Sequence, residues 1–243
     1  MIKEAIEKIQ LMDVPHVVED KNGVLYVDKE MRRLDVPKYA QPIEMKTLSS
    51  LIDYINDFRD DYKKFAYFLH VVSPERVELV SSLDEDRKRE VMAVAKAELP
   101  KIPFGEFIEN ERMLIIVQAM FAEGADTDRA LLLRFAGTTT SGSVKEYGDD
   151  GVTQKATIKT GVASKAEAIV PSPCVLRPYR TFNEVEQPAS KFIFRMRENE
   201  RSKTIESALY EADGGAWRNE ARANICRYLQ EHLKGKTEML VIA

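Results

Sequence analysis

The sequence has few of the residues on which most metal and redox sites depend. Its 243 residues include two cysteines and three histidines, namely Cys174, Cys226, His16, His70 and His232. It contains no CxxC or HExxH pattern, and no two histidines lie within four residues of each other. A conventional zinc site and a disulfide framework are therefore excluded. We expect no metal, no cofactor and reduced cysteines.

Motifs of nucleotide hydrolysis and covalent catalysis are also missing. The sequence contains no GxSxG, no GxGxxG and no GxxxxGK[ST]. Asp149-Asp150-Gly151 is an acidic pair of the kind that a two-metal nuclease uses, but Asp-Gly is more typical of a hairpin turn. We expect no catalytic residues. An enzyme stays open as an alternative, because acidic and basic side chains distant in sequence can converge in a fold.

Long hydrophobic runs and charges of a single sign are absent as well. The longest apolar runs, such as MLIIV at 113–117, fall far short of the roughly 18 residues that span a bilayer. The first residues carry charges at Lys3, Glu4, Glu7 and Lys8, unlike the apolar core of a signal peptide. We therefore expect a cytoplasmic protein with no membrane partner. The formal net charge of −4 also argues against a protein that coats polyanions over its whole surface.

The hydrophobic pattern predicts an α+β protein. Its N-terminal half is mixed and has a central helix pair, and its C-terminal half is β-rich and closed by one long helix. The predicted helices cover residues 2–12, 48–58, 104–124, 125–137 and 216–233. The predicted strands comprise a hairpin around Asn22-Gly23, residues 65–72 and 76–83, three short strands after residue 143, and residues 174–182, 192–198, 204–212 and 238–243. Residues 91–99 suit a strand or a helix. The 104–124 helix has apolar groups on most sides, which predicts a central position.

Composition suggests three segments along the chain. Residues 1–46 form an N-terminal helix, hairpin and arm, residues 47–137 an α/β segment with the central helices, and residues 138–243 a β-rich segment. TTTSGS at 138–143 is the best linker candidate, because it is small and polar. The alternative is that these segments form one compact domain.

One region has a clear local excess of positive charge. Residues 151–180 carry five basic residues against Glu167 alone, a local charge of +4. The basic residues and an interleaved tyrosine form the candidate ligand-binding set: Lys155, Lys159, Lys165, Arg177, Tyr179 and Arg180. Lys155 and Lys159 share a parity, so on a regular strand they face the same side. Such a surface suits nucleic acid or a phosphorylated ligand, and the alternative is the solvated face of a sheet.

The order of several segments resembles the YfdQ-like proteins of phages and prophages, a domain of unknown function. The resemblance covers roughly residues 45–230 and includes SLIDYINDF at 50–58, FLHVVSPERVELV at 68–80, PFGEFIENERMLIIVQAM at 103–120, AEAIVPSPCVLRPYRTF at 166–182 and KFIFRMRE at 191–198. It implies a phage origin and a host-cell cytoplasmic setting. It also implies a gene neighbourhood of replication and recombination functions. It transfers no active residue.

These observations lead to two hypotheses of different classes. The first is a non-enzymatic phage accessory protein, homo-oligomeric, that binds nucleic acid or a nucleotide through the basic set in connection with phage DNA metabolism. The alternative is a protein-interaction or counter-defence module that binds a host protein. A particle-related structural protein is a third class, although the chain lacks a tail-fibre or coiled-coil signature.

Overall fold

The structure is a computed structural model that divides the chain into two compact units, residues 1–39 and 40–243. We call them the N-terminal unit and the main unit. The structure describes residues 2–12, 14, 17–19, 25–27, 39–57, 66–84, 87–138, 144–149, 154–160, 164–169, 172–233 and 239–243. The α+β fold class is confirmed, and the long C-terminal helix is present.

The N-terminal unit contains helix α1 (Ile2–Met12) and the antiparallel strands β1 (Val17–Glu19) and β2 (Leu25–Val27). The strands form the predicted hairpin, although its Asn22-Gly23 turn lies outside the described residues. None of the side chains described in this unit is buried. Ile2, Ile6 and Ile9 recur at helical spacing and form an exposed apolar stripe on α1.

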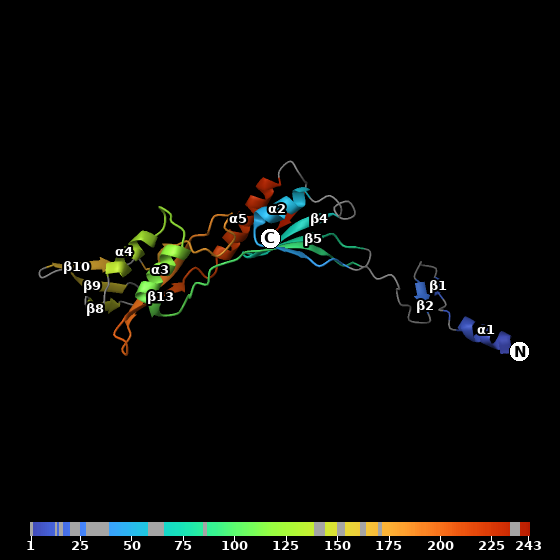
Figure 1. Ribbon diagram of the computed structural model, residues 1–243, viewed down its shortest axis with the longest axis horizontal. Helices are drawn as coiled ribbons and strands as arrows, with labels where there is room; N and C mark the ends of the chain where they lie inside the picture. The colour runs from blue at the N-terminus through green and yellow to red at the C-terminus, as the bar shows by residue number, and fades with distance from the viewer. Residues whose placement is uncertain are drawn as a thin grey trace. The chain divides into compact units, whose positions relative to one another are not determined.

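A five-stranded sheet with two helices forms the first core of the main unit. Its strand order is β14-β4-β5-β6-β3, with parallel pairing at both edges and antiparallel pairing in the middle. The strands are β3 (Ile43–Met45), β4 (Tyr67–Ser73), β5 (Arg76–Ser81), β6 (Val91–Lys96) and β14 (Leu240–Ile242). Helices α2 (Leu48–Asp57) and α5 (Trp217–His232) pack on it through Leu48, Leu51, Ile225 and Leu229 (Figure 1).

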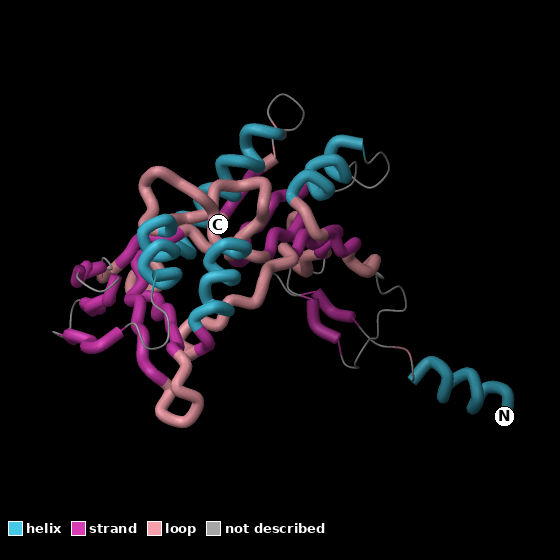
Figure 2. The backbone as a smooth tube through the Cα atoms, turned by 60° about the vertical axis from the view of Figure 1, so that its left-hand side comes forward, coloured by secondary structure: helices cyan, strands magenta, loops and turns pink. Residues whose placement is uncertain are grey.

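A four-stranded antiparallel sheet with two further helices forms the second core. Its strand order is β11-β12-β13-β7, and helices α3 (Asn110–Met120) and α4 (Arg129–Thr138) pack against it (Figure 2). The strands are β7 (Ile108–Glu109), β11 (Cys174–Leu176), β12 (Ser190–Glu198) and β13 (Ile205–Glu211). Phe192, Phe194 and Met196 alternate along β12 and are all buried, as expected for a sheet covered on one face.

Two predicted elements are shorter than expected. The predicted 104–124 helix begins only at Asn110, because Gly105 adopts a positive φ of 77° and Ile108–Glu109 pairs with β13. This helix, α3, lies at the surface rather than at the centre, since Ile115 is 58% exposed. The predicted 174–182 strand ends at Leu176, and beyond it Pro178 makes only an isolated bridge to Phe121.

The three short strands predicted after residue 143 are present. They are β8 (Val144–Asp149), β9 (Gln154–Thr160) and β10 (Ser164–Ile169), and they form an antiparallel sheet in the order β10-β9-β8. Of these strands the structure describes the backbone pairing. Residues 91–99, for which the sequence left both types open, contain the strand β6.

Residues 177–190 connect the two cores, and we call them the bridging segment. Phe182 and Val185 are buried in the first core, while Ser190 begins β12 of the second. The Thr181 hydroxyl donates to the Pro74 carbonyl at the β4–β5 turn over 2.5 Å. A carboxylate oxygen of Glu184 accepts hydrogen bonds from the backbone N–H groups of Leu48 at 2.8 Å and Ser49 at 3.2 Å. Glu184 therefore caps α2 from a distant part of the chain.

Helix α2 also has a cap from the residue that precedes it. The Thr47 hydroxyl accepts a hydrogen bond from the Ser50 backbone N–H over 3.1 Å. Thr47 and Glu184 thus satisfy different N–H groups of the first turn, one from the adjacent residue and one from the bridging segment.

Replacing Glu184 with alanine tests the connection between the cores. We expect the free energy of unfolding to fall by about 1 kcal/mol, the usual effect of losing a helix cap, while Thr47 keeps α2 helical. Chemical denaturation measures the loss. Asn183→Ala, an exposed neighbour, is the matched control and should change stability by less than about 0.5 kcal/mol. Equal losses in the two variants would contradict the capping role.

Candidate functional site

The structure places the six candidate residues in two different settings. Lys155, Lys159 and Lys165 lie on the three-stranded sheet, in β9 and β10. Arg177, Tyr179 and Arg180 lie in the bridging segment beyond β11. The two groups must be considered separately, because the bridging segment packs between the cores and the three-stranded sheet has its own pairing.

The register places the three lysines on one face of their sheet. Lys159 lies opposite Lys165, and Lys155 lies opposite Ile169. Alternate positions of a strand belong to opposite faces, and directly paired residues share a face, so positions 155, 159 and 165 lie together. We call this surface of β9 and β10 the lysine face. Glu167 pairs with Thr157 on the same face, which leaves a net charge of +2.

The opposite face of this sheet has a different composition. By the same register its middle holds Val144, Tyr147, Ala156, Ile158, Ala166 and Ala168, and the strand ends add the polar residues Asp149, Gln154, Thr160 and Ser164. An antiparallel sheet with one apolar and one charged face normally packs its apolar face and leaves the charged one in water. The lysine face is therefore the face expected to meet a ligand.

Arg177 already has two carboxylate partners. Its guanidinium donates to a carboxylate oxygen of Asp126 and to one of Glu186, each over 2.7 Å. Both carboxylates lie outside the 151–180 window in which the sequence shows its positive excess. Arg177 is 22% exposed, and its ion pairs join the α3–α4 loop to the bridging segment.

Arg180 is a buried cation of the interior. Only 6% of it is exposed, and its guanidinium donates to Glu211 and to the Ser190 hydroxyl. It also stacks on the Trp217 ring, with the guanidinium carbon 3.9 Å from the ring centroid. Burial lowers the pKa of Arg180, and the neighbouring Glu211 charge opposes that shift. A cation enclosed in this way cannot reach a polymer in solution.

Tyr179 lies between these arginines and is half-buried. Its backbone N–H donates to the Met120 carbonyl over 3.0 Å, which attaches the bridging segment to the C-terminal end of α3. The six residues that the sequence suggested as one binding surface therefore belong to two different parts of the structure. Arg177 and Arg180 form ion pairs within the main unit, and the three lysines lie on the separate sheet of β8, β9 and β10.

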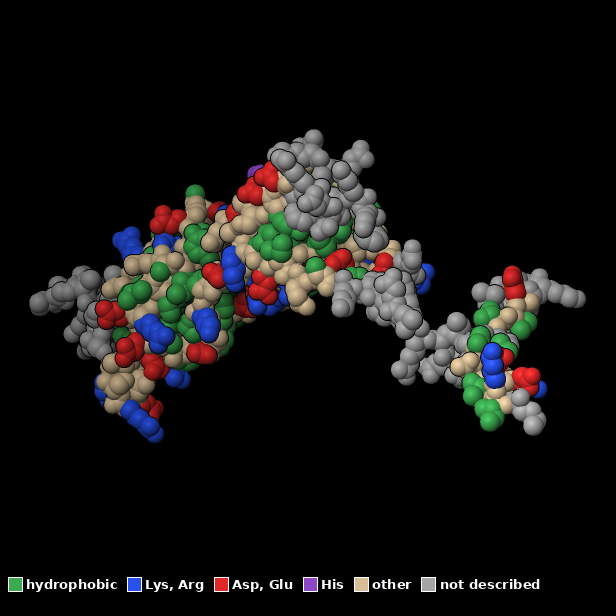
Figure 3. Space-filling view, turned by 45° about the vertical axis from the view of Figure 1, so that its right-hand side comes forward, with side chains coloured by type: hydrophobic (Ala, Val, Ile, Leu, Met, Phe, Trp, Pro, Cys, Tyr) green, Lys and Arg blue, Asp and Glu red, His purple; other side chains and the backbone are tan. Residues whose placement is uncertain are grey.

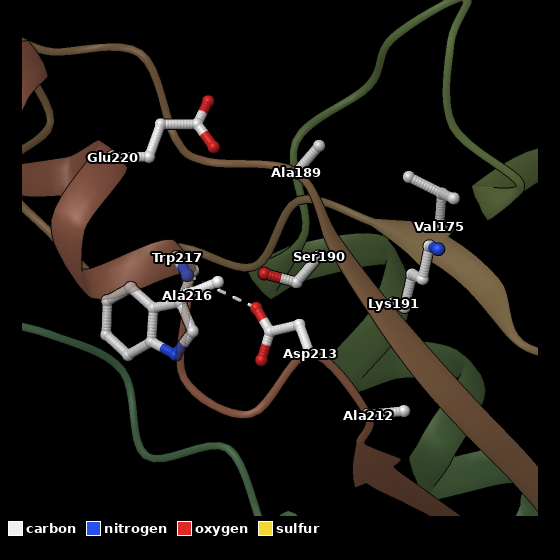
Figure 4. A pocket seen from close by; sticks show the side chains of 9 residues that line it. All are labelled: Val175, Ala189, Ser190, Lys191, Ala212, Asp213, Ala216, Trp217 and Glu220. Atoms are coloured by element: carbon white, nitrogen blue, oxygen red, sulfur yellow. Dashed lines mark hydrogen bonds between the residues drawn. The ribbon is translucent and has the colours of Figure 1, made fainter.

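A shallow cavity of about 450 Å³ is lined by nine residues (Figure 4), and two of them, Ser190 and Trp217, contact Arg180. Its lining includes the start of β12, the β13–α5 turn and the first turn of α5, with Lys191, Asp213, Trp217 and Glu220 among its residues. Asp213 accepts hydrogen bonds from the Gly215 N–H at 2.9 Å and the Trp217 N–H at 3.3 Å. Its carboxylate therefore holds the turn that begins α5.

The charge of Asp213 is stabilised by these neighbours. Burial acts to raise the pKa of this carboxyl group. Hydrogen bonds from Gly215, Ser190 and Trp217, together with the positive charge of Arg180, outweigh that effect and hold the pKa below its usual value. The Asp213 carboxylate in the cavity wall is therefore held by hydrogen bonds within the protein. Sequence analysis did not predict this network of Asp213, Ser190 and Arg180.

Burial disfavours the thiolate form of both thiols. Cys174 is fully buried in β11, and burial, with a smaller effect from Asp128, raises its pKa to about 12. Cys226 packs against the first core, and partial burial raises its pKa. Among the described residues, no group of three or more His, Cys, Asp or Glu side chains could hold a metal ion.

Over the main unit, charges of both signs are interspersed. Figure 3 shows Lys and Arg side chains beside Asp and Glu side chains on the face turned to the viewer. None of the helices in the described part of the chain is long and apolar enough to cross a bilayer.

Comparison with known proteins gives no assignment. No protein-family model matches the chain, and no significant similarity to a curated protein or a solved structure is found. The resemblance to YfdQ-like phage proteins therefore stays a prediction.

Substituting the two arginines separately tests their assigned roles. Arg180→Met removes a buried cation and leaves Glu211 without its partner, so we expect a loss of about 2–4 kcal/mol in unfolding free energy. Arg177→Met breaks ion pairs whose carboxylates are about 60% exposed, so we expect a loss of only about 0–1 kcal/mol. Urea denaturation separates the two variants. Similar losses would show that Arg180 is not the buried anchor described above.

Proposed function

We propose that this chain binds nucleic acid through the lysine face of β9 and β10, as a non-enzymatic and homo-oligomeric accessory protein of the phage or prophage kind. The observation that carries the proposal is the register that brings Lys155, Lys159 and Lys165 onto one face. Lysines contact phosphate groups as point charges, and each contact releases condensed counterions. Thr157 lies on the same face, and threonine hydroxyls are common phosphate donors.

The separation of the lysines favours a polymer over a single nucleotide. At about 3.3 Å per residue, positions 155 and 159 lie about 13 Å apart along β9. Lys165 lies across from Lys159, which doubles the positive charge at one end of the face. Positive charges spread over this length meet several phosphates of a chain at once.

The acidic character of the chain supports a confined binding surface. The formal net charge is −4, and the arginines nearest to the lysines in sequence are engaged with carboxylates. A polyanion is therefore repelled by the net charge of the protein and attracted by the local positive charge of the lysine face. Binding of this kind weakens steeply as salt screens the local attraction.

Charge reversal on the lysine face tests the proposal. In Lys155→Glu/Lys159→Glu, we expect DNA affinity at low salt to fall by about 10-fold or more and the slope of log K against log salt to lose about 2 units. Fluorescence anisotropy over a salt series measures both quantities. The matched control is Lys96→Glu/Lys101→Glu, which makes the same change in net charge at exposed positions elsewhere. If the two double variants lose affinity equally, the lysine face is not the binding surface.

A second candidate function has a specific observation in its favour. The apolar stripe of α1 is uncovered within the N-terminal unit, where Ile2 is 80%, Ile6 51% and Ile9 65% exposed. Lys3, Glu4, Glu7 and Lys8 give the helix balanced charge, unlike the cation-rich helices that bind membranes. An amphipathic helix of this kind suits a hydrophobic groove on another protein, in line with the host-protein alternative.

Two matched substitutions on α1 test whether its apolar stripe binds a host protein. Ile6→Asp puts a charge on the apolar stripe, while Leu11→Asp makes a comparable change on the other side of the same helix. If α1 binds a host protein, stoichiometric recovery of that polypeptide with the tagged chain should fall by about 10-fold or more for Ile6→Asp and stay within about twofold for Leu11→Asp. Native mass spectrometry reads the stoichiometry. Equal recovery with both variants would remove the stripe from the interface.

A further inference from the structure

The lysine face differs from a single-strand-binding surface in one respect. Across β8, β9 and β10 the only aromatic residue is Tyr147, and the register puts it opposite Ala156, on the face without the lysines. The positions that share the lysine face are Gly148, Thr157, Glu167 and Ile169. No aromatic ring therefore accompanies the lysines on the described strands.

This composition decides between two kinds of nucleic-acid ligand. Proteins that bind single strands combine basic grooves with aromatic side chains on which the bases stack, and each stacked base contributes about 1–3 kcal/mol. The lysine face has the charges without the stacking platform. It is suited to a ligand whose phosphates alone supply the affinity, and a duplex presents about twice the charge per unit length of one strand.

The spacing of the lysines fits the outside of a double helix. Positions 155 and 159 lie about 13 Å apart along β9, and positions 159 and 165 about 5 Å apart across the strands. The major groove of B-form DNA is about 12 Å wide. Lys155 and the Lys159–Lys165 pair are therefore separated by a distance that spans the groove, with one lysine at one side and two at the other.

We infer that the lysine face binds a double-stranded nucleic acid by its phosphate backbone, across a groove and without reading the base sequence. This inference rests on the proposed function and specifies its ligand. Lysines contacting phosphates fix position on the duplex and carry no sequence information. Thr157 lies between Lys155 and Lys159 on the same face, and threonine is a smaller residue than the lysines beside it.

The test compares three DNA probes on the full chain: a 20-base-pair duplex, a duplex of unrelated sequence and the corresponding 20-nucleotide single strand, at about 0.1 M salt. We expect both duplexes to bind with affinities within about twofold of each other and about 10-fold or more tighter than the single strand. In Lys155→Glu, duplex affinity should fall and the salt slope should drop by about 1. Tyr147→Leu should leave single-strand affinity within about twofold of the parent chain.

The outcomes separate this inference from the proposed function. Equal or tighter binding of the single strand, with a loss in Tyr147→Leu, would establish stacking and overturn the duplex assignment while nucleic-acid binding stands. Unequal affinity for the two duplexes would overturn backbone readout. Binding of none of the probes would overturn the proposed function together with this inference. Circular dichroism of each variant confirms that the protein is folded before affinities are compared.

Discussion

The enclosed guanidinium of Arg180 is the interaction on which the arrangement of the main unit depends. Burying a cation is costly unless it has partners, and here Glu211, Ser190 and the face of Trp217 supply them. These partners belong to the end of β13, the start of β12 and the start of α5. The contacts of the Arg180 guanidinium therefore hold together three parts of the main unit: the sheet of the second core, the bridging segment and helix α5 of the first core.

The two kinds of basic residue have different roles in this protein for physical reasons. Arginine keeps its charge when buried, donates along several directions and stacks on aromatic rings, which suits the buried position of Arg180 and the half-buried position of Arg177. Lysine is a strongly hydrated point charge and is better placed in water. The positive excess that the sequence shows over residues 151–180 is thus divided between arginines in ion pairs and the lysines on one face of β9 and β10. The proposed binding of nucleic acid involves only the lysines.

Local patterns predict most of the fold, and distant contacts decide the rest. Helix α2 and strands β4 and β12 follow from hydrophobic periodicity, which is a property of each segment alone. The 104–124 helix is wrong at its start because Ile108–Glu109 pairs with β13, a partner about 100 residues away that no local pattern reveals. For the same reason the sequence did not show that Arg177 and Arg180 form ion pairs. Their partners Asp126, Glu186 and Glu211 lie outside the 151–180 window.

The sheet and helices of the first core come from two parts of the chain, and the elements of the second core lie between these parts in sequence. Strands β3 to β6 lie within residues 43–96, whereas α5 and β14, which complete their sheet and cover it, come only after residue 216. During synthesis, α5 cannot cover the face of β4, β5 and β6 until it has left the ribosome. The intervening second core has nearly all of its elements earlier, so it is able to fold first. Until α5 arrives, the apolar surface around Leu69 and Leu79 is open to chaperones and to aggregation.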